Sequence, residues 1–391
     1  MSTLGLLFTA GMSLDIWVSQ GLISREKQIY EEHLKLGHFD KIIWFTYGRN
    51  DMAVYDKLLK EQTIDQRIQI VPMPKIFIGG HLTRLYTYLL PYIQRRYCKE
   101  LDVIKTNQMG GAWTGAIIQK KYKKPFLLRT GYTCSTLYEN KIEKSNTIRE
   151  KYRNKKLLNK YKKIEKTLYS KCDFATVSSN HDKEYICDAY TISTDKIEVV
   201  PNYIDCNIFR LYTPWNERKK RFLFVGRLSE EKNLFNTIQA IGELGIGLDI
   251  YGKGHLRSKL EELVQKNSYD ICFKGTVANQ ELPNIYNAYC YYVLASPFEG
   301  MPKTLLEAMS CGVLCFGTNT SGIKEIINDG INGYLIPDTS VQSIKNTIQT
   351  GINRNDYKEL TENAIHQIYN KNSLQSVTSL EWGIIKRISN M

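Results

Sequence analysis

The segment Phe222-Leu-Phe-Val-Gly-Arg-Leu-Ser-Glu-Glu-Lys-Asn233 predicts a buried β-strand that runs directly into a polar loop. Gly226 ends the apolar run, and Arg227 and Lys232 have side chains long enough to reach outward from the loop. In open α/β sheets, ligands bind beyond the carboxyl ends of the strands. A guanidinium and an ammonium at such an end would stabilise concentrated negative charge, as on a diphosphate.

Three more strand-to-loop transitions follow in the same half of the chain. Ile250-Tyr-Gly-Lys-Gly254 and Phe273-Lys-Gly-Thr-Val277 are each weak signals alone, because glycine ends many strands. The third transition follows the apolar run Tyr292–Leu294. Four such transitions in order predict one binding edge along a single parallel sheet.

The loop after the last of these runs carries two carboxylates, in Phe298-Glu-Gly-Met-Pro-Lys-Thr-Leu-Leu-Glu-Ala-Met-Ser-Cys-Gly312. Pro302 is favoured in the first turn of a helix, where its missing N–H has no cost. We therefore expect Glu299 in the loop before a helix and Glu307 about one turn inside it. A helix N-terminus offers unpaired N–H groups and positive dipole to an anion, so the two carboxylates would hold hydroxyls on either side of a phosphate.

Short β-branched or aromatic runs alternate with helical patterns along the whole chain, which indicates parallel sheets built from βαβ units. The expected strands are Leu4–Phe8, Ile42–Phe45, Ile68–Val71, Val103–Thr106, Phe126–Arg129, Ala175–Ser178, Ile197–Val200, Arg221–Val225, Leu248–Tyr251, Ile271–Phe273, Tyr292–Leu294 and Val313–Phe316. The expected helices include Glu26–Leu36, Leu82–Cys98, Lys144–Ser170, Asn233–Leu244, Leu256–Gln265 and Lys303–Ser310.

This pattern predicts an α/β protein with two Rossmann-like, doubly wound domains. Proline, asparagine and aspartate cluster between Pro201 and Trp215, so we place the boundary there. The expected domains are residues 1–200 and 201–372, with a C-terminal helix over 373–391 that packs back on the first domain.

Composition indicates a soluble globular protein, with 42% hydrophobic and 24% charged residues. No apolar run approaches the roughly 18 residues of a membrane span. The N-terminal stretch has Asp15 and no basic region, which argues against a signal peptide. Nine dispersed cysteines without a CxxC pair are typical of reduced thiols, so we expect a cytoplasmic protein.

Basic residues are concentrated in the first half, where 33 lysines and arginines face 21 acidic residues, against 20 and 19 in the second half. One interpretation of this charge is a solvated basic helix. The sharper interpretation is a surface that attracts either anionic lipid, at the inner face of the cell membrane, or a phosphate-bearing acceptor. Nucleic acid is not expected, since zinc-finger spacing and RNP-type motifs are missing. Apolar stripes with Leu85, Leu89 and Tyr92, and with Leu157 to Tyr169, are predicted to be core.

The chain resembles a retaining glycosyltransferase of family 4, in the glycosyltransferases group 1, whose GT-B fold has two Rossmann-like domains facing a cleft. The motifs that carry this resemblance lie mainly in residues 195–340. They are Pro201-Asn-Tyr-Ile-Asp205, Val225-Gly-Arg-Leu228 with Lys232, Tyr251-Gly-Lys-Gly254, Phe273-Lys-Gly275, Ser296-Pro-Phe-Glu-Gly-Met-Pro302, Leu306-Glu-Ala-Met309 with Gly312, Ser321-Gly-Ile-Lys-Glu325 and Gly333.

The resemblance implies transfer of a sugar from a nucleotide diphosphate sugar to a glycan or lipid-linked glycan, with retention and without a metal or other cofactor. Six dispersed histidines without an HExxH motif agree with metal independence. Arg227 and Lys232 would contact the diphosphate, Glu299 the sugar and Glu307 the ribose. The implied catalytic residues are Glu299, Arg227 and Lys232, and the implied donor site is Gly226, Arg227, Lys232, Gly252, Val277, Glu299, Gly300, Met301, Pro302, Thr304, Leu305 and Glu307.

The first half departs from the family pattern near the expected reaction centre. Gly131 stands where many relatives have a histidine. The paired glycines before the first helix are reduced to Gly21-Leu22. On the acceptor side, the candidate residues are Gly21, Asn107, Arg129 and Tyr132.

Three other functions remain open from the residues alone. The paired carboxylates also resemble those of a glycosidase, although a neutral glycoside would not use Arg227 and Lys232. A sugar-nucleotide epimerase on a similar fold would convert its donor without an acceptor. A non-catalytic sugar-nucleotide-binding protein would bind donor without turnover, and the missing histidine is the one feature in its favour.

Overall fold

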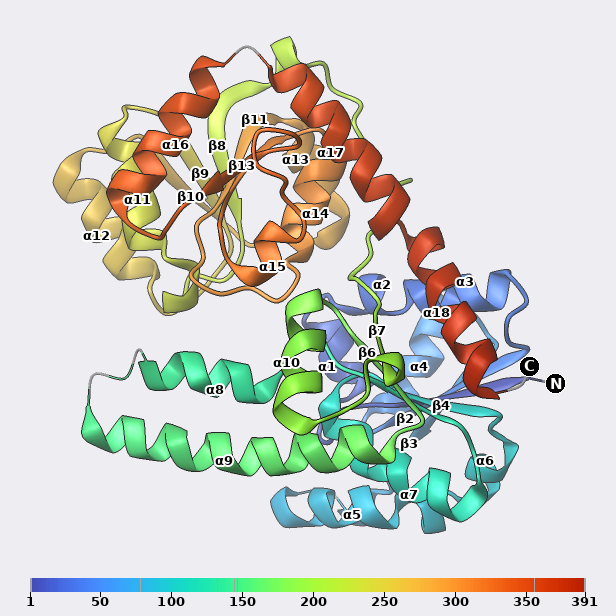
Figure 1. Ribbon diagram of the computed structural model, residues 1–391. Coiled ribbons are helices and arrows are strands. Elements are labelled where there is room, and N and C mark those ends of the chain that lie inside the picture. Colours follow the sequence, from blue (N-terminus) through green and yellow to red (C-terminus); the bar gives the residue numbers. More distant parts are fainter. Residues whose placement is uncertain are drawn as a thin grey trace. The chain divides into compact units, whose positions relative to one another are not determined.

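The computed structural model describes residues 2–77, 79–131, 133–143, 145, 147–354 and 356–389. The chain forms two compact units (Figure 1). Unit 1 is Met1–Val200 together with Thr378–Met391, and unit 2 is Pro201–Val377.

Unit 1 has a seven-stranded parallel sheet with strand order β3-β2-β1-β4-β5-β6-β7. Its strands are β1 (Thr3–Leu7), β2 (Lys41–Thr46), β3 (Ile68–Pro72), β4 (Val103–Thr106), β5 (Phe126–Arg129), β6 (Phe174–Val177) and β7 (Ile197–Val199). Its helices are α1 (Leu14–Ser19), α2 (Ile23–Glu26), α3 (Gln28–Lys35), α4 (Asp51–Lys60), α5 (Gly80–Ile93), α6 (Arg95–Glu100), α7 (Ala112–Tyr122), α8 (Cys134–Glu143), α9 (Ile148–Lys171), α10 (Asn180–Tyr190) and most of α18 (Leu374–Ser389).

Unit 2 has a six-stranded parallel sheet with strand order β10-β9-β8-β11-β12-β13. Its strands are β8 (Lys219–Val225), β9 (Leu248–Tyr251), β10 (Ile271–Gly275), β11 (Tyr289–Leu294), β12 (Leu314–Thr318) and β13 (Tyr334–Ile336). Its helices are the 3-10 turn η5 (Glu230–Lys232), α11 (Leu234–Glu243), α12 (Arg257–Asn267), α13 (Leu282–Asn287), α14 (Lys303–Ser310), α15 (Ser321–Lys324), α16 (Val341–Asn353) and α17 (Tyr357–Asn372).

These two sheets confirm the predicted fold class. In each unit, helices cover both faces of the sheet (Figure 1). The central strands are buried on both faces, as parallel strands require, and β11 is buried along its whole length. In the part of the chain that the structure describes, no helix is both long and apolar enough to cross a bilayer.

Several predicted boundaries were wrong. The helix expected over Lys144–Ser170 begins at Ile148, where the Thr147 hydroxyl caps it, and α8 precedes it. Strand β13 was not predicted, because its three residues are too short for a periodic signal. It nevertheless pairs with β12 and completes the sheet of unit 2.

The helix expected over Leu82–Cys98 is two helices, α5 and α6, which meet at Gln94. Its predicted core stripe was wrong, since Leu85 is 48% and Tyr92 is 54% exposed. The helix instead buries the face that carries Tyr86 and Leu90. Apolar spacing identified an amphipathic helix but assigned the wrong face to the core.

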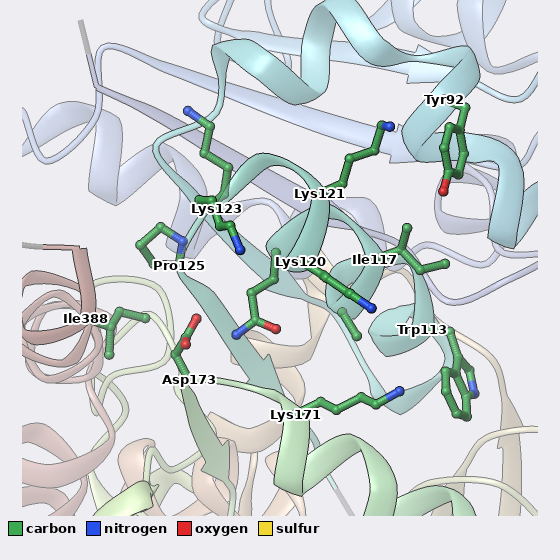
Figure 2. Close-up of a pocket in the computed structure, with 13 residues that line it drawn as sticks. Tyr92, Trp113, Ile117, Lys120, Lys121, Lys123, Pro125, Lys171, Asp173 and Ile388 are labelled. Atoms are coloured by element: carbon green, nitrogen blue, oxygen red, sulfur yellow. The ribbon is translucent and has the colours of Figure 1, made fainter.

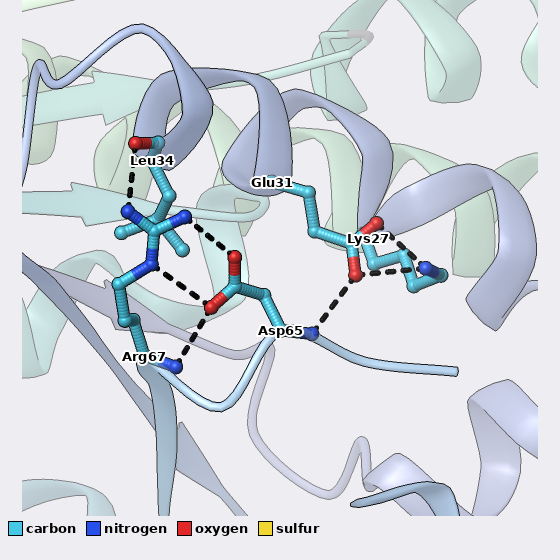
Figure 3. Close-up of polar contacts among 5 residues, drawn as sticks. All are labelled: Lys27, Glu31, Leu34, Asp65 and Arg67. Atoms are coloured by element: carbon cyan, nitrogen blue, oxygen red, sulfur yellow. Dashed lines mark hydrogen bonds and ion pairs between the residues drawn. The ribbon is translucent and has the colours of Figure 1, made fainter. Parts of the chain in front are cut away.

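A polar cluster ties α3 to the turn before β3 (Figure 3). The Arg67 guanidinium donates to both carboxylate oxygens of Asp65, at 3.0 and 2.7 Å, and to the Leu34 carbonyl at 3.0 Å. This hydrogen bonding holds the pKa of Asp65 below its ordinary value. The Asp65 N–H in turn donates to Glu31, which also accepts from Lys27.

The C-terminal helix α18 is anchored in unit 1 by a fully buried ionic cluster. Lys105 Nζ on β4 lies 2.6 and 2.7 Å from the two carboxylate oxygens of Glu381. His33 Nε2 on α3 lies 3.1 Å from the same carboxylate. Burial alone would raise the pKa of Glu381, but the Lys105 charge and the His33 hydrogen bond outweigh it and lower that pKa. Lys105 is therefore part of the core.

Candidate donor-binding site

The sheet of unit 2 has a topological switch point between β8 and β11. From β8 the chain proceeds through β9 to β10 on one side, and β11, β12 and β13 follow on the other. Loops that leave adjacent strands in opposite directions open a crevice at the carboxyl edge, which is where such sheets bind ligands. Lys232 follows β8 and Glu299 follows β11, so the predicted residues flank this point.

The structure brings Lys232 and Glu299 into direct contact. Lys232 Nζ lies 2.5 Å from Glu299 Oε1, and the two side chains are 16% and 12% exposed. Asn233 ends η5 in the left-handed conformation, with φ of 51°, and its amide donates to the Thr339 carbonyl. This turn aims the lysine back across the strand end. The sequence singles out both residues but does not predict that they pair.

Arg227 lies on the same loop as Lys232 but is open to solvent. Its side chain is 78% exposed, and Nη2 is 3.3 Å from Glu231 Oε1. At this exposure the ion pair restrains the guanidinium weakly. Arg227 is therefore able to swing toward an anion at the strand end.

Glycines let the backbone of this edge pack closely. The Gly226 N–H donates to the Tyr251 carbonyl at 2.9 Å, and the Gly252 N–H donates to the Gly275 carbonyl at 2.7 Å. Gly252 has φ of 148°, and a Cβ there would lie 1.8 Å from the Gly226 carbonyl oxygen. The predicted Gly226 and Gly252 therefore lie in closely packed loops at the strand ends. Val277 lies just beyond β10 and is half-buried.

The loop that carries Glu299 is held in place from two sides. Asn202 Nδ2 donates to the Met301 carbonyl at 2.7 Å. On the other side, a Cβ on Gly322 would lie 1.6 Å from the Gly300 carbonyl oxygen, so α15 presses against the loop backbone. Pro302 is the N-cap of α14, and no side-chain hydrogen bond caps this end. The loop therefore presents the helix N-terminus in a defined position.

Within α14, the first two predicted residues differ in what they offer a ligand. Thr304 is half-buried and its Oγ1 is 2.8 Å from the Tyr292 hydroxyl. Leu305 is fully buried, and its N–H already bonds to the Pro302 carbonyl at 3.2 Å. The resemblance implies a ligand contact at Leu305, and in this structure its N–H is bonded within the helical turn.

The second carboxylate, Glu307, is in a different environment from Glu299. It is 2% exposed, and the Tyr286 hydroxyl donates to Oε2 at 2.9 Å. Its place one turn inside α14 confirms the predicted helix position. The two carboxylates therefore differ, because Glu299 is ion-paired with Lys232 and Glu307 is almost fully buried and hydrogen-bonded to Tyr286.

Two hydroxyl groups that were not predicted to belong to the donor site lie at the same edge. Ser296 follows β11 and Thr320 follows β12. Among the described residues, neither Ser296 Oγ nor Thr320 Oγ1 has a hydrogen-bond partner although both are buried. A hydroxyl after a strand is too common in sequence to be a signal, so only the structure reveals them.

In unit 1 the corresponding switch point lies between β1 and β4. The Asn107 N–H donates to the Leu7 carbonyl at 3.0 Å, and Arg129 Nη1 donates to the Asn107 carbonyl at 3.2 Å. These two predicted residues are thus brought together. Gln108, which was not predicted, accepts from the Gly131 N–H at 2.8 Å and so lies beside the position that lacks a histidine.

The two other acceptor-side candidates are Gly21 and Tyr132. Gly21 was expected to open the first helix, but α1 ends at Ser19 and Gly21 follows it with φ of 67°. The loop after β1 contains Gly11 instead, with φ of 85°. Helix α1 was not predicted, because the segment between Gly11 and Gly21 consists largely of serine and apolar residues. Tyr132 lies outside the described residues.

Known structures share this architecture over the whole chain. The structure of HepE from Anabaena in complex with UDP superposes with a TM-score of 0.74 and 16% identity, covering 100% of both chains. This likeness establishes the GT-B fold.

Family models for "Glycosyl transferases group 1" and "Glycosyltransferase Family 4" match residues 209–368 and 29–208. The chain belongs to the group 1 glycosyltransferases with a GT-B fold.

Two curated relatives are informative. One is the GtfA subunit of UDP-N-acetylglucosamine–peptide N-acetylglucosaminyltransferase from Streptococcus pneumoniae, 30% identical over 58% of this chain and 44% of the relative. The other is UDP-Gal:alpha-D-GlcNAc-diphosphoundecaprenol alpha-1,3-galactosyltransferase from Escherichia coli, 27% identical over 54% of this chain and 56% of the relative. The chain spans about half the length of the curated relatives it matches.

Proposed function

We propose that this protein is a retaining glycosyltransferase that moves a sugar from a nucleotide diphosphate sugar to a glycan or lipid-linked glycan acceptor. It would serve the synthesis of a cell-surface polysaccharide or glycolipid at the cytoplasmic face of the membrane. The observation that carries the proposal is the Lys232–Glu299 pair across the β8/β11 switch point.

The cationic groups beside this pair suit a donor diphosphate. Lys232 is held at the strand end, and Arg227 is free to move toward it. The N-terminus of α14 adds backbone N–H groups and the positive end of the helix dipole. In a partly desolvated crevice these groups stabilise the charge that develops on a leaving phosphate. We therefore propose that the reaction needs no metal ion.

Glu299 would orient the sugar through its hydroxyls. One of its oxygens is paired with Lys232, so the same contact places the carboxylate and neutralises it beside the diphosphate. Glu307 would accept from the ribose hydroxyls. Because Glu307 is almost fully buried, that contact requires a small opening of the side chains around it.

In the proposed step, the bond between the anomeric carbon and the diphosphate oxygen breaks, and the acceptor hydroxyl oxygen bonds to the same face of that carbon. The hydroxyl proton passes to the leaving phosphate oxygen, and a nucleoside diphosphate is released. Arg227 and Lys232 would stabilise the leaving group. A carboxylate nucleophile is not required.

The relatives favour particular reagents for the first experiments. The streptococcal protein is named for transfer from UDP-N-acetylglucosamine, and the Escherichia coli protein for transfer of galactose from UDP-Gal to a diphosphoundecaprenol-linked sugar. UDP sugars and lipid-diphosphate-linked acceptors are therefore the first to test. Unit 1 would bind the acceptor near Asn107 and Arg129.

The test is UDP release that depends on acceptor, measured with and without EDTA, together with the anomeric configuration of the product by nuclear magnetic resonance. We expect transfer with retention that EDTA leaves intact. Lys232→Ala should lower the rate by roughly 100-fold, the loss typical for one stabilising donor. Lys253→Ala, in the exposed loop after β9, is the matched control and should transfer normally.

Near-normal transfer by Lys232→Ala and Glu299→Gln would remove the site assignment. Inversion at the anomeric carbon would overturn the retaining mechanism. Conversion of the donor sugar without acceptor would favour an epimerase instead.

A further inference from the structure

One flank of unit 1 exposes a row of large apolar side chains on α5. The opposite face of this helix packs on α7, where the Tyr122 hydroxyl donates to the Pro91 carbonyl at 2.6 Å and Thr114 Oγ1 donates to the Thr87 carbonyl at 2.7 Å. The solvent-facing row consists of Leu82, Leu85, Tyr88, Tyr92 and Ile93. Exposed apolar side chains that share one helix face mark a contact site more often than single scattered ones do.

A lysine-rich pocket of about 1020 Å³ lies at the Tyr92 end of this row (Figure 2). Asp173 is the one carboxylate among its described lining residues, and the Phe126 N–H already donates to it at 2.7 Å. The positively charged lining residues are Lys120, Lys121, Lys123, Lys124 and Lys171. The pocket therefore carries a strong excess of positive charge beside an apolar row.

Aromatic rings connect the charge to the apolar surface. Lys121 Nζ lies 4.5 Å from the centroid of the Tyr92 ring, and Lys171 Nζ lies 5.3 Å from that of Trp113. Figure 2 shows both rings at the same side of the pocket. Tryptophan, tyrosine and lysine together are typical of the interface between water and a bilayer, where rings sit at the headgroup level and ammonium groups reach the phosphates.

We propose that this flank, formed by the exposed row of α5 and the lysine pocket, docks unit 1 on an anionic lipid bilayer. The charge complementarity favours a phosphate-rich surface. Exposed leucines have no favourable partner on a nucleic-acid backbone, whereas they insert between lipid headgroups. The combination therefore selects a membrane over a nucleic acid.

The strand directions show how such docking serves the reaction. Lys124 and Lys171 precede β5 and β6, so the pocket is at the amino edge of the sheet, opposite Asn107 and Arg129. Helix α5 follows β3 and runs back along the sheet, so its Leu82 end starts at the carboxyl edge. The flank thus extends from one edge to the other. This inference rests on the proposed lipid-linked acceptor, but it concerns residues outside the proposed donor site.

The experiment is co-sedimentation of the full chain with vesicles of phosphatidylcholine alone or mixed with phosphatidylglycerol. We expect binding to the mixed vesicles that weakens with salt. The triple variant Lys120→Ser, Lys121→Ser, Lys123→Ser should lower partitioning roughly 100-fold, because each lysine near an anionic surface contributes about 1 kcal/mol. Leu82→Ser with Leu85→Ser should lower it further, at little cost in stability since both side chains are exposed.

The matched control removes three exposed lysines from the basic helix α9 by Lys155→Ser, Lys156→Ser, Lys160→Ser. Equal loss in this control, or equal binding of the native chain to both vesicle types, would overturn the proposal. So would full vesicle binding by the leucine variant combined with lysine-dependent binding to a DNA duplex, which would indicate a nucleic-acid surface. Thermal shift with UDP sugars separates the two proposals, since the flank variants should keep donor binding whether or not transfer is observed.

Discussion

Lys232 Nζ and Glu299 Oε1 lie 2.5 Å apart although 67 positions separate them in the chain. The contact joins the loops that leave β8 and β11, on the two sides of the switch point of unit 2. A group proposed to bind phosphate is thus positioned by a group proposed to bind sugar. The two should therefore behave as one unit when either is changed.

The first prediction is a double-mutant cycle on this pair. Lys232→Met and Glu299→Gln should each weaken donor binding, and the double variant should lose less than the two single losses added together. We expect a coupling of about 1–3 kcal/mol, as for residues in one ion pair. Calorimetric titration with donor measures it. Lys274→Met is the control, because Lys274 pairs with Asp249 instead, and its effect should add to that of Glu299→Gln.

The second prediction concerns the glycine that supports the Glu299 loop. Gly322→Ala places a Cβ 1.6 Å from the Gly300 carbonyl oxygen, so the loop backbone has to move. We expect a loss of about 2–3 kcal/mol in stability, together with weaker donor binding. Gly245→Ala meets nothing within 4 Å at φ of 67°, so it should cost only about 1 kcal/mol and leave donor binding intact. Urea unfolding and donor titration compare them, and equal effects would contradict the tight packing of α15.

The third prediction concerns the buried ion pair of unit 1. Glu381→Leu leaves the Lys105 ammonium buried without its partner, which should cost about 3–5 kcal/mol in unfolding free energy. Adding Lys105→Met should restore much of this loss. Arg387→Ala, on the same helix as Glu381, removes an exposed ion pair with Glu198 of β7 and should cost less than about 1 kcal/mol. A double variant as unstable as Glu381→Leu would show that the charge is not the cause.

The fourth prediction is a pH dependence of stability. Burial, followed by the charges of His33 and Lys386, lowers the pKa of His38 from 6.5 to about 4. His38 also stacks on Trp382, with ring centroids 4.5 Å apart. Because the unfolded chain binds the proton first, stability should fall as pH drops from 6.5 toward 4. His38→Gln should flatten this dependence relative to the native chain, whereas His366→Gln, at an exposed position, should preserve it. Parallel thermal melts across this range provide the comparison.

Much of the fold could be predicted because its signals are local. A buried parallel strand is a short apolar run, and glycine or proline marks where it ends, so strands such as Leu248–Tyr251 and helix Lys303–Ser310 have the bounds expected. The exposed face of α5 could not be predicted, since apolar spacing identifies a stripe but not its partner. Gly21 was misplaced because the six residues of α1 are too few for a periodic pattern.

The sequence by itself determined the order of strands and helices and the residue types at each strand end. These follow from propensity and from the period of apolar residues, which act over a few positions along the chain. Only the tertiary structure decided that Lys232 pairs with Glu299, that Glu307 is buried against Tyr286, and that Lys105 neutralises Glu381. Such contacts depend on strand order and side-chain direction across distant segments. The charge and burial of a site therefore depend on the assembled fold, even where the sequence already identifies its residues.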